Sequence, residues 1–264
     1  MEKLQRYIEV YKCAKDFLGR IVDNHPQLNR EILNDHLSNK SRFNNLSDAN
    51  RRLIESLSNR NMMPSVINFL EKEKIMEPML YDYNPKDITK NYPSSDELFM
   101  KFRMTFEIKN VESKRNLWRK FSEGIISGSK FLSSFNDESD FDNFVKIFSL
   151  NKFTKAALPM LLSDEIDGFG FALACDFLKE LGYRDYPKPD VHLIKIFHEL
   201  GLCETSNPYD VYKSIIEMSE IVGDDAYTVD KTFWLISSGR FYLVDVEVGR
   251  NRDKFIKEMK EKLK

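Results

Sequence analysis

Two short patterns in the second half of the chain combine residue types that could hold a phosphate and stabilise a developing positive charge. The first contains Gly168 and Gly170, and it lies between two segments with helical spacing, 152–163 and 171–181. Glycine supplies the backbone freedom that a tight turn needs. The turn also exposes N–H groups at the start of the second helix, where a phosphate binds well. This pattern therefore predicts a helical hairpin that could contact a phosphate.

The second pattern is centred on Asp190, which follows Gly168 by 22 residues. Pro187 and Pro189 stiffen its approach, and the apolar segment VHLIKIFHEL follows it. We expect Asp190 at or near the N-cap of a helix, where the helix dipole favours an anion. Each pattern alone is usually an ordinary turn or an ordinary cap. The two together at this spacing are much rarer, which favours a functional interpretation.

The combined pattern resembles the helix-hairpin-helix DNA glycosylase superfamily. Members of that superfamily typically read Leu-Pro-Gly-Val-Gly at the hairpin and Val-Asp-x-His at the aspartate. The resemblance covers about forty residues of this chain. The matching residues are Ile166-Asp167-Gly168-Phe169-Gly170, Ala174 and Pro189-Asp190-Val191-His192.

The resemblance implies an all-α, bilobal fold with a helix-hairpin-helix motif and a cleft between the lobes. It also implies a partner, double-stranded DNA with a damaged or modified base that is flipped out of the stack. Asp190 would be the catalytic carboxylate, stabilising positive charge on the deoxyribose as the N-glycosidic bond breaks. No metal or organic cofactor would be needed. The backbone amides expected against a DNA phosphate are those of Gly168, Phe169, Gly170, Phe171 and Ala172.

The chain departs from the superfamily pattern at two positions in the hairpin. Asp167 replaces the usual proline, which would weaken the grip on a phosphate. Ala172 stands where bifunctional members carry a lysine, so we expect base release without efficient strand cleavage. Lys188 leaves an alternative nucleophile open. Only Cys203 lies downstream of the pattern, which excludes the four-cysteine iron–sulfur site of some branches.

Two further residues could support a site or simply pack. His192 is the third residue of the aspartate motif, and in the superfamily this position mostly packs or supports. Trp234 could line a base pocket, although a tryptophan at helical spacing is more often part of the core. We expect Trp118 in the core and Cys175 as a small buried residue. The basic groups around 114–120 and 250–264 could follow phosphates, but such runs usually form a solvated helix face.

The elements that must position these residues are predicted to be helices. The chain has 10 glycines and 9 prolines among 264 residues, fewer than a turn-rich β protein would carry. We read residues 77–94 as a long loop and FYLVDVEV, 241–248, as the one convincing strand. The helices predicted from apolar spacing and caps include 2–23, 112–135, 138–148, 152–163, 171–181, 191–200, 207–222, 228–238 and 250–264, and others are expected to start near Ser47, Pro64 and Ser95.

The loop at 77–94 sets the expected boundary between an unplaced N-terminal helical region, 1–94, and a glycosylase-like core, 95–264, whose hairpin spans 152–182. The sequence has no apolar run long enough for a membrane span and no signal pattern at its N-terminus. We therefore expect no membrane partner and a monomer inside the cell, nucleoid-associated in the cytoplasm of a prokaryote or nuclear in a eukaryote.

Two other function classes stay open at this point. A non-enzymatic helix-hairpin-helix DNA-binding protein would use the hairpin alone and would gain nothing from Asp190. A helical interaction protein in which the pattern is coincidental would not bind DNA. Within the glycosylase interpretation the target base is not readable, and one low-weight variant is a defence enzyme that excises a modified base from phage DNA.

Overall fold

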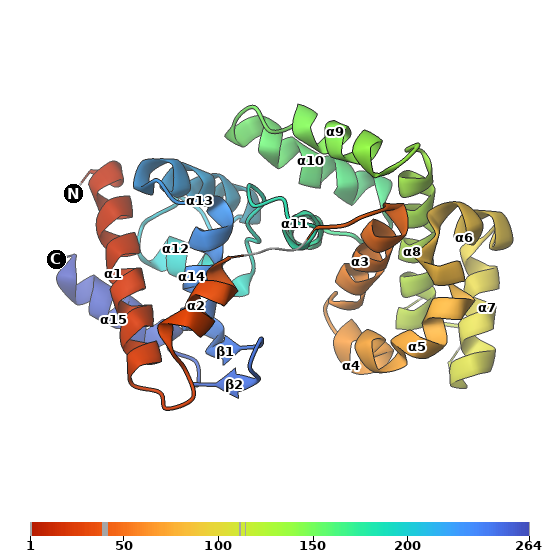
Figure 1. The fold of residues 1–264 in the computed structure, drawn as a ribbon, viewed down its shortest axis with the longest axis horizontal. Coiled ribbons are helices and arrows are strands. Elements are labelled where there is room, and N and C mark those ends of the chain that lie inside the picture. The colour runs from red at the N-terminus through yellow and green to blue at the C-terminus, as the bar shows by residue number, and fades with distance from the viewer. Residues whose placement is uncertain (1, 39–41, 111, 114, 264) are drawn as a thin grey trace. The chain divides into compact units, whose positions relative to one another are not determined.

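The computed structural model describes residues 2–38, 42–110, 112–113 and 115–263. It is mostly helical, as the composition and spacing predict, with fifteen α-helices and one two-stranded sheet among the described residues (Figure 1). Contacts group the chain into two compact units. We call Met1–Ser41 with Gly182–Lys264 the terminal unit, and Arg42–Leu181 the central unit.

The terminal unit brings both ends of the chain into one helical cluster. Within it α1 packs against α13 and α14, and α12 packs against α14 (Figure 1). Buried Tyr7 and Tyr11 of α1 join these parts, since their hydroxyls donate to the Leu202 carbonyl and the Asp224 carboxylate. Its elements are α1 (Lys3–Asp23), α2 (Arg30–Leu37), α12 (Val191–Glu199), α13 (Pro208–Val222), α14 (Ala226–Ser238), β1 (Arg240–Phe241), β2 (Val246–Glu247) and α15 (Arg252–Lys262).

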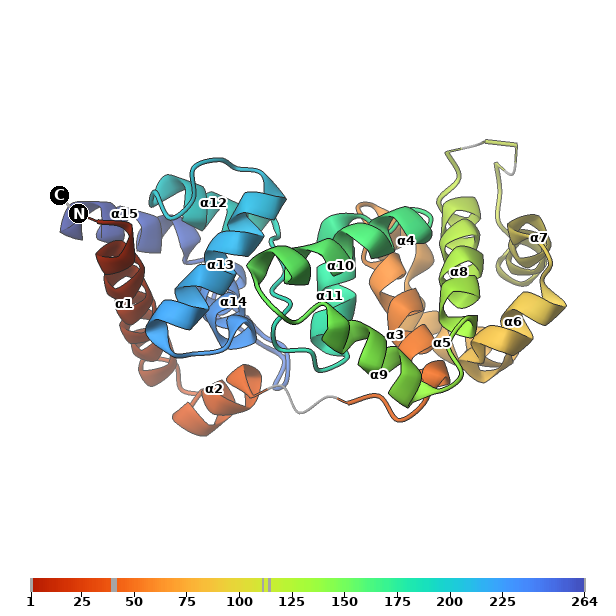
Figure 2. The ribbon, with the colours of Figure 1, turned by 90° about the horizontal axis from the view of Figure 1, so that it is seen from above.

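The central unit is built around α8, which lies between α3 and α7 (Figure 2). Phe102, Trp118 and Phe121 form a buried aromatic cluster where α7 meets α8. Its elements are α3 (Leu46–Ser58), α4 (Met63–Ile67), α5 (Phe69–Met79), the 3₁₀ helix η1 (Tyr81–Tyr83), α6 (Pro85–Asn91), α7 (Ser95–Phe106), α8 (Leu117–Ser133), α9 (Glu138–Ile147), α10 (Lys152–Glu165) and α11 (Phe171–Glu180).

The expected loop at 77–94 is wrong, because its prolines divide short helices rather than prevent them. Pro78 lies in the last turn of α5, and Pro85 opens α6 behind the Asn84 cap. A proline is tolerated in the first helical turn because its missing N–H has no partner there. The expected boundary at residue 94 also differs from the grouping of contacts, since α5, α6 and α7 all belong to the central unit.

The single strand expected at 241–248 is also wrong. The apolar run folds back on itself, so that β1 and β2 pair antiparallel with Arg240 opposite Glu247 and Phe241 opposite Val246. Asp245 has a positive φ of 52° in the turn between them.

Most predicted helices are present within a few residues of the expected ends. The structure confirms the start of α13 at the Asn207 cap and the end of α14 at Gly239. The helix expected over 112–135 begins later, at Leu117, and Lys114 lies outside the described residues. The last helix is not simply an exposed basic helix, because α15 buries Phe255, Ile256 and Met259. No helix among the described residues is long and apolar enough to span a membrane.

Candidate functional site

The turn between α10 and α11 combines two buried apolar residues with three exposed residues. Ile166 and Phe169 are buried, and Phe169 packs edge-on against Phe177 of α11 with ring centroids 5.9 Å apart. Gly168 and Gly170 face outward. The turn is also tied to α8, since the Asp167 N–H donates to the Ser127 hydroxyl at 2.9 Å. The buried side chains of Ile166 and Phe169 and this hydrogen bond hold the turn in one conformation.

The two glycines serve different purposes. Gly168 has φ +74°, a left-handed conformation that disfavours any residue with a Cβ. Gly170 has φ −69° and ψ 162°, which every residue adopts, so the backbone freedom expected of Gly170 is not needed. A Cβ at Gly170 would have no atom within 4 Å. Gly170 therefore leaves open space beside the first turn of α11.

The structure divides the five amides that sequence reasoning grouped together. The Phe169 N–H donates to the Ile166 carbonyl at 3.1 Å, so it is used inside the turn and is not available to a ligand. The N–H groups of Gly168, Gly170 and Ala172 donate no hydrogen bond within the described residues. Gly170 is the N-cap of α11 and offers no side-chain cap. The start of α11 thus keeps orphan donors that could bind an anion.

Arg60, in the connection between α3 and α4, completes this turn, and sequence reasoning missed it. A Cβ on Gly168 would lie 2.3 Å from Arg60 Nη1, so the guanidinium packs directly against the glycine. The half-buried guanidinium has no carboxylate partner among the described residues. No local pattern could reveal this contact, because more than a hundred residues separate the two positions. A hollow of about 350 Å³ is lined by Arg60, Ser163, Gly168, Phe169, Gly170 and Leu173.

The charge around this turn is mixed. Asp164, Glu165 and Asp167 are exposed on the last turn of α10 and in the turn itself. These carboxylates oppose the long-range attraction of a phosphate. Binding would therefore rely on the directional N–H donors of α11 and on Arg60 rather than on a broad positive field.

Asp190 caps α12 as predicted, and it belongs to the terminal unit. Its Oδ1 accepts hydrogen bonds from the His192 N–H at 2.8 Å and the Leu193 N–H at 3.1 Å. The half-buried side chain leaves Oδ2 without a hydrogen-bond partner in the described chain. The two amides hold this oxygen in place at the N-terminus of α12. A fixed carboxylate with one free oxygen can stabilise positive charge or align a water molecule.

His192 lies on the first turn of α12 behind this carboxylate. Its Nδ1 is buried and has no hydrogen-bond partner. Burial lowers the pKa of His192, and the nearby charges of Arg250 and Arg252 lower this pKa further, against the opposite effect of Asp190. The imidazole is therefore neutral near pH 7, and it does not neutralise the Asp190 carboxylate as a cation would.

Lys188 and Trp234 lie in the same unit as Asp190, whereas Trp118 and Cys175 belong to the central unit. The Lys188 N–H donates to Asp230 of α14 at 2.7 Å, which fixes the backbone of this residue. Trp234 is half-buried rather than fully in the core, and its ring lies edge-on to Tyr242 at 6.0 Å. Buried Lys231 lies over the Trp234 and Tyr242 rings and donates to the Tyr242 hydroxyl at 3.2 Å. Trp118 and Cys175 are buried, as predicted.

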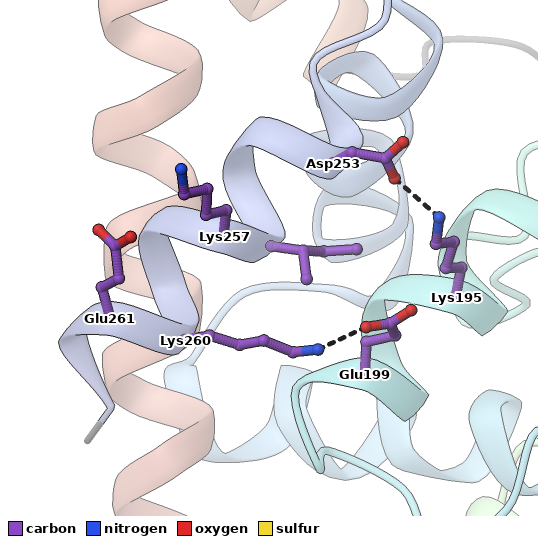
Figure 3. Close-up of a pocket in the computed structure, with 7 residues that line it drawn as sticks. Lys195, Glu199, Asp253, Lys257, Lys260 and Glu261 are labelled. Carbon is purple, nitrogen blue, oxygen red and sulfur yellow. Dashed lines mark hydrogen bonds and ion pairs between the residues drawn. The ribbon is translucent and has the colours of Figure 1, made fainter.

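A hollow of about 370 Å³ lies between α12 and α15, and the charged side chains that line it form ion pairs with one another. Figure 3 shows Lys195 reaching Asp253 at 2.8 Å and Lys260 reaching Glu199 at 2.5 Å across this hollow. Three basic and three acidic side chains line it, so it favours neither an anion nor a cation. The described residues also contain no group of three or more His, Cys, Asp or Glu that could hold a metal ion.

Comparison with known proteins identifies no relative of this chain. No family model matches the chain, and neither a curated protein nor a solved structure matches it.

Proposed function

We propose that this protein is a DNA glycosylase that hydrolyses the N-glycosidic bond of a damaged or modified base flipped out of duplex DNA. The observation that carries the proposal is Asp190, whose Oδ1 is held by two backbone amides while Oδ2 is free. A carboxylate that only caps a helix has no need of the stiff Pro187 and Pro189 approach. In the proposed reaction Asp190 stabilises positive charge on the deoxyribose and aligns the attacking water.

The turn between α10 and α11 supports the DNA partner. Gly168 and Gly170, whose N–H groups are orphan donors, and Arg60 line one exposed hollow. The orphan N–H of Ala172 lies in the first turn of α11. Donors of this kind fit a phosphate of the DNA backbone. Ala172 carries no amine for a Schiff base with the sugar. The proposal is therefore base release by hydrolysis, without efficient strand cleavage.

The decisive experiment compares wild type with Asp190→Asn on a pool of oxidised, alkylated, deaminated, mismatched and phage-modified duplexes, reading released bases by mass spectrometry. Asparagine caps a helix about as well as aspartate, so α12 stays intact while the charge is lost. We expect a base that only the wild type releases. Full activity of Asp190→Asn would refute the assigned role. If neither protein releases a base but both still bind DNA, the result would instead favour a non-enzymatic DNA-binding protein.

The phosphate contact is tested separately with Arg60→Gln. Each phosphate contact contributes about −0.9 to the slope of log K against log salt concentration. Arg60→Gln should therefore weaken duplex binding and make that slope shallower by about one. Lys257→Gln on α15, whose lysine lines the ion-paired hollow of Figure 3, is the matched control. An equal effect of both substitutions would show that Arg60 contributes only bulk charge.

A further inference from the structure

The backbone just before Asp190 offers few N–H groups. Pro187 and Pro189 have no N–H, so within residues 187–190 only Lys188 and Asp190 can donate a backbone hydrogen bond. The Asp190 N–H donates to the Lys188 carbonyl at 2.9 Å, a bond inside the segment. The Lys188 N–H donates to Asp230 Oδ2 at 2.7 Å. The bond to Asp230 thus ties the backbone of this segment to α14.

Asp230 is unusual for an acidic residue because it is 1% exposed on α14. Burying a carboxylate is costly unless it is hydrogen-bonded, and a charged acceptor makes a shorter and stronger bond than a neutral one. The 2.7 Å bond to the Lys188 N–H is of this short type. A buried carboxylate aimed at a backbone N–H two residues before Asp190 fixes where that segment enters α12.

We infer that Asp230 is a positioning residue for Asp190, acting through the Lys188 peptide, and this inference rests on the proposed function. Both backbone groups of Lys188 are hydrogen-bonded: its N–H donates to Asp230, and its carbonyl accepts from the Asp190 N–H. If Asp230 no longer accepts this bond, the segment is free to shift, and the Asp190 carboxylate shifts with it. A displacement of about 1 Å can cost a hundredfold in rate when a catalytic group must meet its substrate in fixed geometry.

The test compares Asp230→Ala, which removes the acceptor, with Asp230→Asn, which keeps a weaker one. We expect Asp230→Ala to lower kcat for base release about tenfold or more and Asp230→Asn a few-fold, with KM for DNA within about twofold in both. Asp210→Ala, which removes a half-buried acid on α13 that accepts from the Thr205 hydroxyl and pairs with Lys213, is the matched control and should leave kcat unchanged. A kcat of Asp230→Ala equal to that of the wild type would overturn the inference.

One further readout separates positioning from a merely structural role. Backbone hydrogen exchange at Lys188 should be faster in Asp230→Ala, and faster to a smaller extent in Asp230→Asn. If Asp230→Ala does not fold, Asp230→Asn decides alone, and unchanged exchange at Lys188 overturns the inference.

Failure of the proposed function is distinguishable from failure of this inference. If the wild type releases no base from any duplex, the glycosylase proposal fails. Backbone hydrogen exchange at Lys188 can still be compared between wild type and Asp230→Asn. Faster exchange at Lys188 in the variant supports anchoring of this segment by Asp230, and unchanged exchange overturns it.

Discussion

Substituting the two turn glycines with alanine should affect stability differently, although both substitutions should weaken DNA binding. Gly168→Ala places a Cβ on a residue with φ +74°, which costs about 1–2 kcal/mol for a left-handed L-residue. The new Cβ would also lie 2.3 Å from Arg60 Nη1. Because that atom ends a flexible side chain, it moves aside at little further cost, but it leaves the hollow. Gly168→Ala should thus destabilise the central unit and displace Arg60.

Gly170→Ala should be nearly neutral for stability. Its φ of −69° suits alanine, and no atom lies within 4 Å of the added Cβ. Reducing the conformational entropy of the unfolded chain stabilises the protein by about 0.4–1 kcal/mol, and alanine is a poorer N-cap than glycine by a similar amount. These effects offset each other. The free energies of unfolding of the two variants should therefore differ by about 1–2 kcal/mol.

Urea unfolding measures this difference in the free energy of unfolding of the central unit. The chain has two tryptophans, and Trp118 is the one in the central unit, so a Trp234→Phe background makes the fluorescence report on the helices around the turn. With a slope of about 2 kcal/mol per molar urea, Gly168→Ala should unfold at a midpoint about 0.5–1 M below Gly170→Ala. Equal midpoints would refute the conformational argument for Gly168.

Duplex binding supplies the other half of the prediction. Both substitutions should weaken DNA binding, Gly168→Ala by displacing Arg60 and Gly170→Ala by filling space beside the open amides of α11. Loss of binding by Gly170→Ala without loss of stability would be the signature of a contact surface. Unchanged binding by Gly170→Ala would contradict the proposed phosphate site while leaving the turn geometry intact.

Three other predictions concern the supporting structure. Burial lowers the pKa of His36, and the charge of Lys231 lowers it further. Burial also lowers the pKa of His192, as do the charges of Arg250 and Arg252. The native state therefore favours the neutral form of both rings. Stability should be full above the unfolded pKa of about 6.5 and fall as pH drops below it, by up to about 1.4 kcal/mol per pH unit for each ring. His36→Gln should flatten this slope in urea titrations. Asp190→Ala should lower the free energy of unfolding by about 1 kcal/mol, and Asp190→Asn by only a few tenths, read from Trp234 in a Trp118→Phe background. Asn50→Ala should lower the free energy of unfolding by about 1–3 kcal/mol, because the Nδ2 of buried Asn50 donates to the Tyr83 carbonyl at 2.9 Å. Asn91 is exposed, and Asn91→Ala should change this free energy by less than about 0.5 kcal/mol.

Features that depend on a few neighbouring residues were predictable from the sequence. Asp190 caps α12 because a short side chain at this position reaches the N–H groups two and three residues later, whatever the rest of the fold does. The same holds for Asn207 at the start of α13. The loop expected at 77–94 failed for a local reason as well. Pro85 suits the first turn of a helix as well as it suits a loop, and composition alone does not distinguish the two.

Features that depend on residues far apart in the chain could not be predicted. Arg60 packs against Gly168 and Asp230 holds Lys188 only because the helices that carry them pack together. Neither residue has a distinctive sequence context. The grouping of α1 with the C-terminal helices is of the same kind, since amphipathic spacing shows that a helix buries one face but not which helix covers it.

The anchoring of the two candidate parts makes binding and chemistry separable. The turn is fixed to α8 through the Ser127 hydroxyl, within the central unit, whereas the segment before Asp190 is fixed to α14 through Asp230, within the terminal unit. A glycosylase built this way should lose DNA affinity but keep kcat at saturating DNA when Arg60 is changed, and lose kcat but keep affinity when Asp230 is changed. The double variant Arg60→Gln/Asp230→Ala should then combine the two single effects additively in free energy, and strong non-additivity would mean that DNA binding itself places Asp190.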